Sequence, residues 1–152
     1  MNVRFATIQD ESAVLSLLDE LISEVNRLSG KLPKFTDGQE KRSKIYKELL
    51  NNSDVKIFVA EKGSQIVGVA DLHIVPVMRR GYFQGHVEDF VIKENERGKG
   101  IGVTLINSIK DYCKKEGIKV IKLSSGLELT RAHKFYINNG GIFTEKLFRF
   151  DL

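Results

Sequence analysis

The sequence predicts an α/β domain in which helices flank a mixed sheet. Two observations support this prediction: helical and strand-like segments alternate along the chain, and helices separate some consecutive strands but not others. At 152 residues, with 41% hydrophobic and 29% charged residues, the chain has the size and composition of one soluble domain. We see no repeat or linker, so we expect residues 1–152 to form a single domain.

The first half of the chain is predicted to contain a strand, two helices and a hairpin. Asp10 can cap the first helix, in which apolar residues recur three and four positions apart. Gly30 and Pro33 break that helix, and Lys62-Gly63-Ser64-Gln65 is typical of a hairpin turn. The predicted elements are a strand over 2–6, helices over 11–28 and 37–50, and strands over 55–61 and 66–74.

The second half of the chain alternates strands and helices. Residues 75–85, which include Pro76, are predicted to be a connection or a twisted strand extension. Thr130 can cap a short last helix, and Gly117 can end the helix before it. The predicted elements are a strand over 87–92, a helix from the following glycine loop to about 116, a strand over 119–124, a helix over 130–138, and strand structure from Ile142 onward.

Composition and charge exclude several classes of protein. No apolar run approaches the ~20 residues that span a bilayer, and no signal peptide is visible, so we expect a cytoplasmic protein without a membrane partner. The net charge of +4 comes from Lys and Arg residues that are spread rather than gathered with aromatics, so we expect no nucleic-acid partner. The histidines lack metal-ligand spacing, and Cys113 falls on an apolar helix face. We therefore expect no metal site and no thiol nucleophile.

The most informative segment is Glu96-Arg-Gly-Lys-Gly-Ile-Gly-Val103, which joins the predicted strand over 87–92 to a helix. Glycines expose backbone N–H groups and a helix start adds partial positive charge, so the segment is suited to binding phosphate. Arg97 and Lys99 add charge beside it. The segment lacks both the Gly-x-x-x-x-Gly-Lys-Ser/Thr of a P-loop and the Gly-x-Gly-x-x-Gly of a dinucleotide-binding fold.

Three segments resemble the GNAT family of N-acetyltransferases, in the order and at the spacing of that family. Arg97-Gly-Lys-Gly100-Ile-Gly102 matches its Arg/Gln-x-x-Gly-x-Gly/Ala loop, and residues 87–91 match the strand before it. Ala132-His-Lys-Phe-Tyr-Ile-Asn-Asn-Gly140 is similar to its Ala-x-x-Phe-Tyr-x-x-x-Gly helix. One departure is Gly141, which stands where the family commonly has Phe. The order of elements resembles the family along the whole chain.

The resemblance implies a GNAT fold, with a mostly antiparallel mixed sheet of about six to seven strands and four helices. It also implies that acetyl-CoA is the co-substrate and that the glycine loop holds its pyrophosphate. Backbone N–H groups near Val91 and Ile92 would then polarise the thioester carbonyl. The residues expected to bind the cofactor are Phe90, Val91, Ile92, Arg97, Gly98, Lys99, Gly100, Ile101, Gly102 and Val103.

Acetyl transfer to an amine needs a proton acceptor, because a protonated amine is not a nucleophile. Glu88 and Asp89 lie just before the loop, with side chains expected on opposite faces of the strand. The pair resembles that of diamine acetyltransferases, which favours Glu88 as general base and Asp89 as an anchor for the ammonium group; either carboxylate could be the base. Tyr136 matches the family tyrosine that faces the cofactor sulfur, which makes it the expected general acid.

The acceptor is expected to be a small primary amine. The closing stretch of the chain is similar to aminoalkylphosphonate acetyltransferases, and Arg79 and Arg80 could bind an anionic group, although an exposed basic loop is the simpler account. In the family the acceptor site involves the segments that correspond to 31–37 and 76–84. A protein lysine or N-terminal amine is the alternative acceptor, and a non-catalytic CoA-binding regulator is a second alternative. A homodimer is possible with any of these functions.

Overall fold

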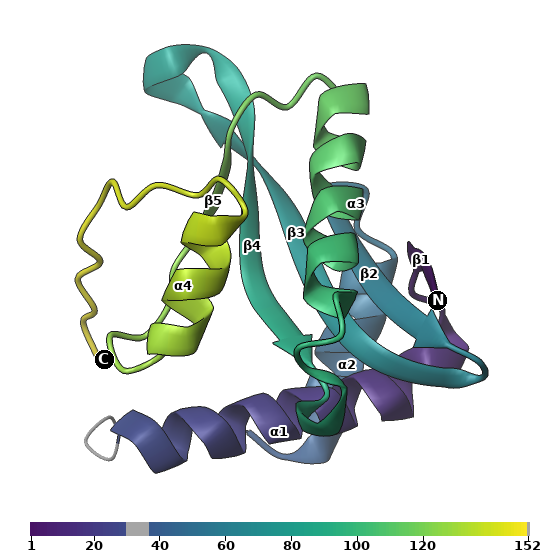
Figure 1. Cartoon of the computed structure of the whole chain (residues 1–152). Helices are drawn as coiled ribbons and strands as arrows, with labels where there is room; N and C mark the ends of the chain where they lie inside the picture. Colours follow the sequence, from purple (N-terminus) through teal and green to yellow (C-terminus); the bar gives the residue numbers. More distant parts are fainter. Residues whose placement is uncertain (30–36, 152) are drawn as a thin grey trace.

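In the computed structural model, which describes residues 1–29 and 37–151, four α-helices cover the two faces of a five-stranded sheet (Figure 1). The helices are α1 (Glu11–Ser29), α2 (Gln39–Leu50), α3 (Ile101–Lys115) and α4 (Thr130–Asn138), with short 3-10 helices η1 (Ile8–Asp10), η2 (Met78–Arg80) and η3 (Glu94–Glu96). The strands are β1 (Asn2–Phe5), β2 (Val55–Lys62), β3 (Gln65–Val77), β4 (Tyr82–Ile92) and β5 (Ile121–Leu123). This arrangement confirms the predicted mixed α/β sheet flanked by four helices.

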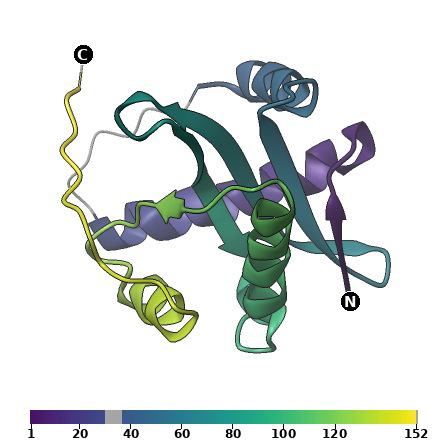
Figure 2. The same ribbon diagram turned by 90° about the horizontal axis from the view of Figure 1, so that it is seen from above.

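The strands follow one another across the sheet in chain order. Neighbours are antiparallel except for β4 and β5, which are parallel and are connected by α3. In the view from above, α1 and α2 lie on one side of the sheet and α3 and α4 on the other (Figure 2). A parallel last pair is what a helix between two strands of one sheet produces.

Each face of the sheet has its own hydrophobic core. On one face, Val14 of α1 and Tyr46 of α2 pack against Val59 of β2. On the other, Leu105 and Ile109 of α3 belong to a cluster built on Phe58, Ala70, Leu72 and Val87 of the strands. Because strand residues alternate between faces, the central strands carry apolar side chains on both. None of the helices in the described ranges is long and apolar enough to cross a membrane.

Residues 75–85 form the strand extension that was one of two predicted possibilities. β3 continues to Val77, η2 turns the chain, and β4 starts at Tyr82. Pro76 lies opposite Phe83 in the β3–β4 register. Gly81 closes the turn at a φ of +64°, in the left-handed region that favours glycine.

The C-terminal strands predicted from Ile142 onward are wrong. Residues 141–151 contain no helix or strand, and seen from above this segment leads away from the end of α4 (Figure 2). An alternating apolar pattern makes a strand only where another strand offers its hydrogen-bonding groups, and none of the described strands pairs with this segment. The sheet therefore has five strands rather than six to seven. The large apolar side chains of residues 141–151 are 78–86% exposed: Ile142, Phe143, Leu147, Phe148 and Phe150.

The predicted capping of the first helix by Asp10 is also wrong. Asp10 ends η1, and its carboxylate accepts the Thr7 N–H at 2.8 Å and two hydrogen bonds from the Arg4 guanidinium at 2.7 and 2.9 Å. These hydrogen bonds, that from Arg4 above all, lower the pKa of Asp10 to about 2. Asp10 thus fastens the end of β1 to the start of α1. The helix break predicted at Gly30 and Pro33 lies outside the described residues.

Candidate functional site

The site predicted from the glycine loop lies where β4 and β5 separate. The two strands pair only between Gly85–Val87 and Ile121–Leu123, and the Gly85 N–H also donates to Val120 O at 2.9 Å. Beyond Val87, β4 continues to Ile92 while the chain after β5 leads away to α4 (Figure 1). No described strand covers this edge of β4, which is left open over 90–92.

A β-bulge lies at the point where the strands separate. In the β3–β4 register, Ala70 pairs with Phe90 and Leu72 with Val87, so the single residue Asp71 lies opposite both Glu88 and Asp89. The Asp89 N–H donates to Asp71 Oδ1 at 2.7 Å. A bulge leaves one amide without a ladder partner, and here a side chain replaces the missing acceptor.

The bulge overturns the expectation that Glu88 and Asp89 point to opposite faces. Glu88 contacts the His86 ring at 3.1 Å, and His86 is paired with His73 of β3. Asp89 interacts electrostatically with His73 and with Arg42 of α2. Both carboxylates therefore lie on the face of the sheet that α1 and α2 cover.

The two carboxylates differ in environment. The Glu88 side chain is 65% exposed, with His86 as a neighbour. Asp89 is half-buried, and burial, followed by the negative charges of Asp71 and Glu88, raises its pKa to about 6. Asp89 can therefore exchange a proton closer to neutral pH than an ordinary carboxyl does.

Backbone amides of β4 point into the open edge. The Lys93 N–H donates to Val67 O of β3 at 2.9 Å. Because amides alternate in direction along a strand, the N–H of Val91 also points toward β3, and those of Phe90 and Ile92 point the other way. Of the predicted pair Val91 and Ile92, Ile92 thus has the N–H that faces the open edge, together with that of Phe90.

The glycine loop ends at the N-terminus of α3 as predicted. Gly98 and Gly100 have φ of +80° and +82°, and Gly100 is the N-cap residue. The first intrahelical bond from this end is donated by Thr104 to Gly100 O at 3.1 Å. The N–H groups of Ile101, Gly102 and Val103 therefore have no acceptor within the helix and are available to an anion.

The charged side chains of the loop have internal partners, a difference from the predicted role beside the phosphate. The Arg97 guanidinium donates to both carboxylate oxygens of Glu24 in α1, at 3.0 and 2.7 Å, and its Nε donates to Ile92 O at 2.8 Å. Lys99 Nζ donates to Asn95 O at 2.8 Å and pairs with Glu96 at 3.2 Å. Arg97 thus ties the loop to α1 and to the end of β4.

Aromatic contacts hold the Tyr136 ring against the open edge of β4. Its ring packs against Phe90 of β4 at a centroid distance of 6.2 Å and against Phe135 at 5.4 Å. Burial raises the pKa of Tyr136 to about 12, and its hydroxyl donates to no group among the described residues. The tyrosine is therefore protonated at neutral pH, with its hydrogen-bonding capacity available.

Gly102 makes this placement of α4 possible. A Cβ added at Gly102 would lie 3.2 Å from Phe135 Cε2, so the missing side chain lets α4 approach α3. Gly102 therefore has a packing role as well as an N–H without an intrahelical acceptor, and a side chain at this position would disturb Phe135.

Several site residues were not identified from the sequence. Asp71 is 8% exposed and fixes the bulge, and its Oδ2 contacts His73 Nε2 at 2.9 Å. An acidic residue inside the apolar run of β3 was the available signal. The role of Glu24 could not be predicted, because in the sequence it occupies an ordinary solvent-exposed position of an amphipathic helix.

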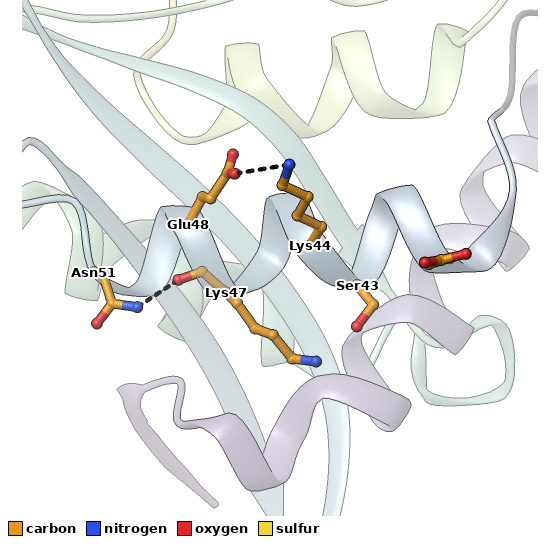
Figure 3. A pocket seen from close by; sticks show the side chains of 6 residues that line it. Ser43, Lys44, Lys47, Glu48 and Asn51 are labelled. Carbon is orange, nitrogen blue, oxygen red and sulfur yellow. Dashed lines mark hydrogen bonds and ion pairs between the residues drawn. The ribbon is translucent and has the colours of Figure 1, made fainter.

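A separate hollow lies on the surface of α2 (Figure 3), and none of its lining residues belongs to β4, the glycine loop or α4. Lys44 pairs with Glu48 at 4.0 Å, and Asn51 Nδ2 donates to Lys47 O at 2.8 Å. These contacts are those of a solvated helix surface. The lining residues are Glu40, Ser43, Lys44, Lys47, Glu48 and Asn51. Within 1–29 and 37–151, no three or more His, Cys, Asp or Glu side chains are grouped to hold a metal ion.

Comparisons with known proteins place the chain in a family. Residues 20–140 match the family model of the acetyltransferase (GNAT) family. The chain is 26% identical over 148 residues to the aminoalkylphosphonate N-acetyltransferase of Salmonella typhimurium, covering 97% of this chain and 88% of that one. It is 33% identical over 98 residues to the glucosamine 6-phosphate N-acetyltransferase of Trypanosoma brucei brucei, covering 64% and 65%. The structure of a tetramutant of the BH1408 protein from Bacillus halodurans superimposes with a TM-score of 0.86 at 21% identity, covering 100% of both chains.

We predict that Gly102→Leu lowers the melting temperature by several degrees, because overpacking against Phe135 costs about 1–3 kcal/mol. Val103→Leu is the control, since Val103 is 41% exposed and has room for the added methylene. Thermal unfolding of the two variants at one pH measures the difference. Equal melting temperatures would show that α3 and α4 do not depend on the close approach at Gly102.

Proposed function

Because the chain belongs to the GNAT family and is an acetyl-CoA-dependent N-acetyltransferase, we propose that it transfers the acetyl group directly to a primary amine of a small molecule. In this proposal a carboxylate of the β4 bulge accepts the proton of the amine and Tyr136 assists the departing sulfur. One observation supports it above others: the open edge of β4 has free amides, the bulge carboxylates and Tyr136 along it, next to a helix N-terminus.

The residues of the loop and of β4 fit acetyl-CoA. The free amides of Ile101, Gly102 and Val103 and the positive end of α3 would bind its pyrophosphate. The N–H groups of Phe90 and Ile92 would donate to the pantetheine arm or to the thioester carbonyl. When bound, acetyl-CoA supplies an acetyl thioester, which is activated toward attack by an amine.

We assign the role of base to Asp89 in place of Glu88, which the sequence favoured. A carboxyl with a pKa near 6 is ionised at neutral pH and is a better proton acceptor than an ordinary carboxylate. Glu88 is exposed beside it and would attract the positively charged acceptor to the site.

Tyr136 would act on the leaving group. With a pKa of about 12, its phenol keeps its proton at neutral pH and can donate a hydrogen bond to the sulfur as negative charge develops there. Full proton transfer to an alkyl thiolate, whose conjugate acid has a pKa of about 8.5, is uphill. Hydrogen-bond donation is therefore the larger part of the proposed role.

Transfer would be direct, in a ternary complex. Cys113 is the only cysteine of the chain, is 2% exposed in the core under α3, and has a pKa raised by burial to about 11. A buried, protonated thiol is a poor nucleophile, so an acetyl-cysteine intermediate is disfavoured.

The acceptor class is proposed from the names of two relatives. An aminoalkylphosphonate and glucosamine 6-phosphate are both small amines that carry a phosphorus-containing acid group. Arg79 and Arg80 of η2 are exposed at the β3–β4 turn and offer positive charge for such a group. A lysine or N-terminal amine of a protein is the alternative acceptor.

An acceptor screen tests the proposal. Thiol release from acetyl-CoA is measured with aminoalkylphosphonates, amino-sugar phosphates, diamines, amino acids and lysine peptides. We expect turnover with a small amine and no acetylated protein when acetyl-CoA is supplied alone. Turnover with peptides only would support the alternative acceptor. CoA binding without turnover on any amine would indicate a regulator.

We predict that Gly100→Asp weakens acetyl-CoA binding at least tenfold, because it puts a carboxylate and a disfavoured φ at the anion site. Gly63→Asp is a matched control: Gly63 also has positive φ, at +63°, with open space around it, in the β2–β3 hairpin. Calorimetry with CoA measures both. Equal affinities in two folded variants would contradict the assignment of the loop.

We predict that kcat/KM falls tenfold per pH unit as the pH drops below about 6, because a base with this raised pKa is lost when it takes up a proton. Asp89→Asn should abolish this limb and lower the rate by about 10²–10⁴-fold at neutral pH. Glu88→Gln should keep the limb, moved slightly to lower pH. The reverse pattern would return the role of base to Glu88.

We predict that Tyr136→Phe lowers kcat by at least tenfold and leaves CoA affinity nearly unchanged, because it removes a donor and keeps the ring. Tyr112→Phe is the control, since Tyr112 of α3 packs against Phe5 of β1 and Phe58 of β2 rather than against the aromatic residues at the open edge. Steady-state kinetics with binding calorimetry separate the two effects. A wild-type kcat in Tyr136→Phe would reduce the tyrosine to a packing residue.

A further inference from the structure

We infer that Asp71 of β3 is a positioning residue, which fixes the bulge of β4 through the Asp89 amide and sets the charge next to the Asp89 carboxyl. This inference rests on the proposed function, in which Asp89 is the base. It concerns a residue on the neighbouring strand that does not border the open edge.

The first role of Asp71 is geometric. At a bulge the extra residue has no partner in the ladder, and a buried N–H without an acceptor is strongly disfavoured. Asp71 Oδ1 accepts the Asp89 N–H at 2.7 Å, a short distance for an N–H···O bond. The bulge in turn decides which amides of β4 face the open edge and on which face the Asp89 carboxyl lies.

The second role follows from the cost of the charge. Asp71 is 8% exposed between Ala70 and Leu72, which are fully buried. Among the described residues it has no Lys or Arg ion-pair partner, only the His73 ring at 2.9 Å. A neutral Asn could accept the same N–H without the desolvation of a carboxylate. The negative charge is therefore best explained by its effect on a neighbour.

That neighbour is Asp89. Two groups of like charge face it, Asp71 across the bulge and Glu88 beside it, and both favour the protonated form, Asp71 more strongly. Two groups oppose them: His73 of β3, when charged, and Arg42 of α2. Arg42 is in turn paired with Asp19 of α1 at 2.6 Å, and His86 contacts Glu88 at 3.1 Å. Asp71 is thus the largest charge effect that keeps a proton available on Asp89.

The two roles can be separated by two substitutions in the full chain. Asp71→Asn keeps an acceptor for the Asp89 N–H and removes the charge, whereas Asp71→Ala removes both. Asp111→Asn, on the exposed surface of α3, is the control. The readouts are the pH titration of the Asp89 carboxyl by ¹³C NMR without substrate, and the pH profile of kcat/KM.

In Asp71→Asn we expect the Asp89 titration and the acid limb of kcat/KM to move down by about one pH unit. The plateau rate should stay within about threefold of wild type. In Asp71→Ala we expect the same shift with a plateau at least tenfold lower, because the bulge loses its acceptor. His73→Gln should move both readouts in the opposite direction, since it removes a positive charge.

An unmoved Asp89 titration in folded Asp71→Asn would overturn the inference, as would equal plateaus in the Asn and Ala variants. A shifted titration with an unmoved acid limb would support the effect of Asp71 and overturn Asp89 as base. Wild-type protein without turnover on any amine would overturn the proposed function and leave the NMR test of Asp71 intact.

Discussion

The need of one backbone amide for an acceptor shapes the candidate site. β4 has one residue more than β3 opposite it, and the amide left over, that of Asp89, is satisfied by the Asp71 carboxylate. Because the bulge is fixed in this way, the amides of Phe90 and Ile92 face the edge that β5 leaves open. The same bulge turns Glu88 and Asp89 onto one face of the sheet. The geometry of the site thus depends on a single contact between two neighbouring strands.

The cofactor loop and the last helix are positioned by different parts of the same segment. Arg97 holds the start of the loop to α1 and to the end of β4. Five residues later, Gly102 lets Phe135 approach, so that Tyr136 reaches Phe90. A segment that reads as a phosphate-binding motif therefore also fixes the distance between two helices. The Arg97 side chain stabilises the fold, and the backbone N–H groups at the start of α3 are available to bind a ligand.

Local patterns predicted most of the elements but not their relations. α4 spans Thr130–Asn138, the range that the sequence indicated, and the glycine end is a local signal. The predicted cap is wrong, because Leu129 rather than Thr130 is the N-cap residue and no side chain caps the helix. The bulge could not be predicted, since register is a property of two strands and neither strand alone shows the extra residue. The same holds for the segment after Ile142, whose alternating apolar residues require a partner strand. Arg97 was recognised as part of a motif, but its partner Glu24 lies 73 positions away along the chain.

The aromatic cluster at the open edge contains a tyrosine whose fluorescence can report on the site. The chain has no Trp and four Tyr residues, so tyrosine dominates its intrinsic fluorescence. Tyr46 and Tyr112 are packed within the cores, and Tyr82 is at the start of β4. Tyr136, whose ring packs against Phe90 of β4, is the fluorophore that contacts the open edge. Ligand occupancy there can be followed on the unlabelled protein, by light emitted from a residue proposed to take part in the chemistry.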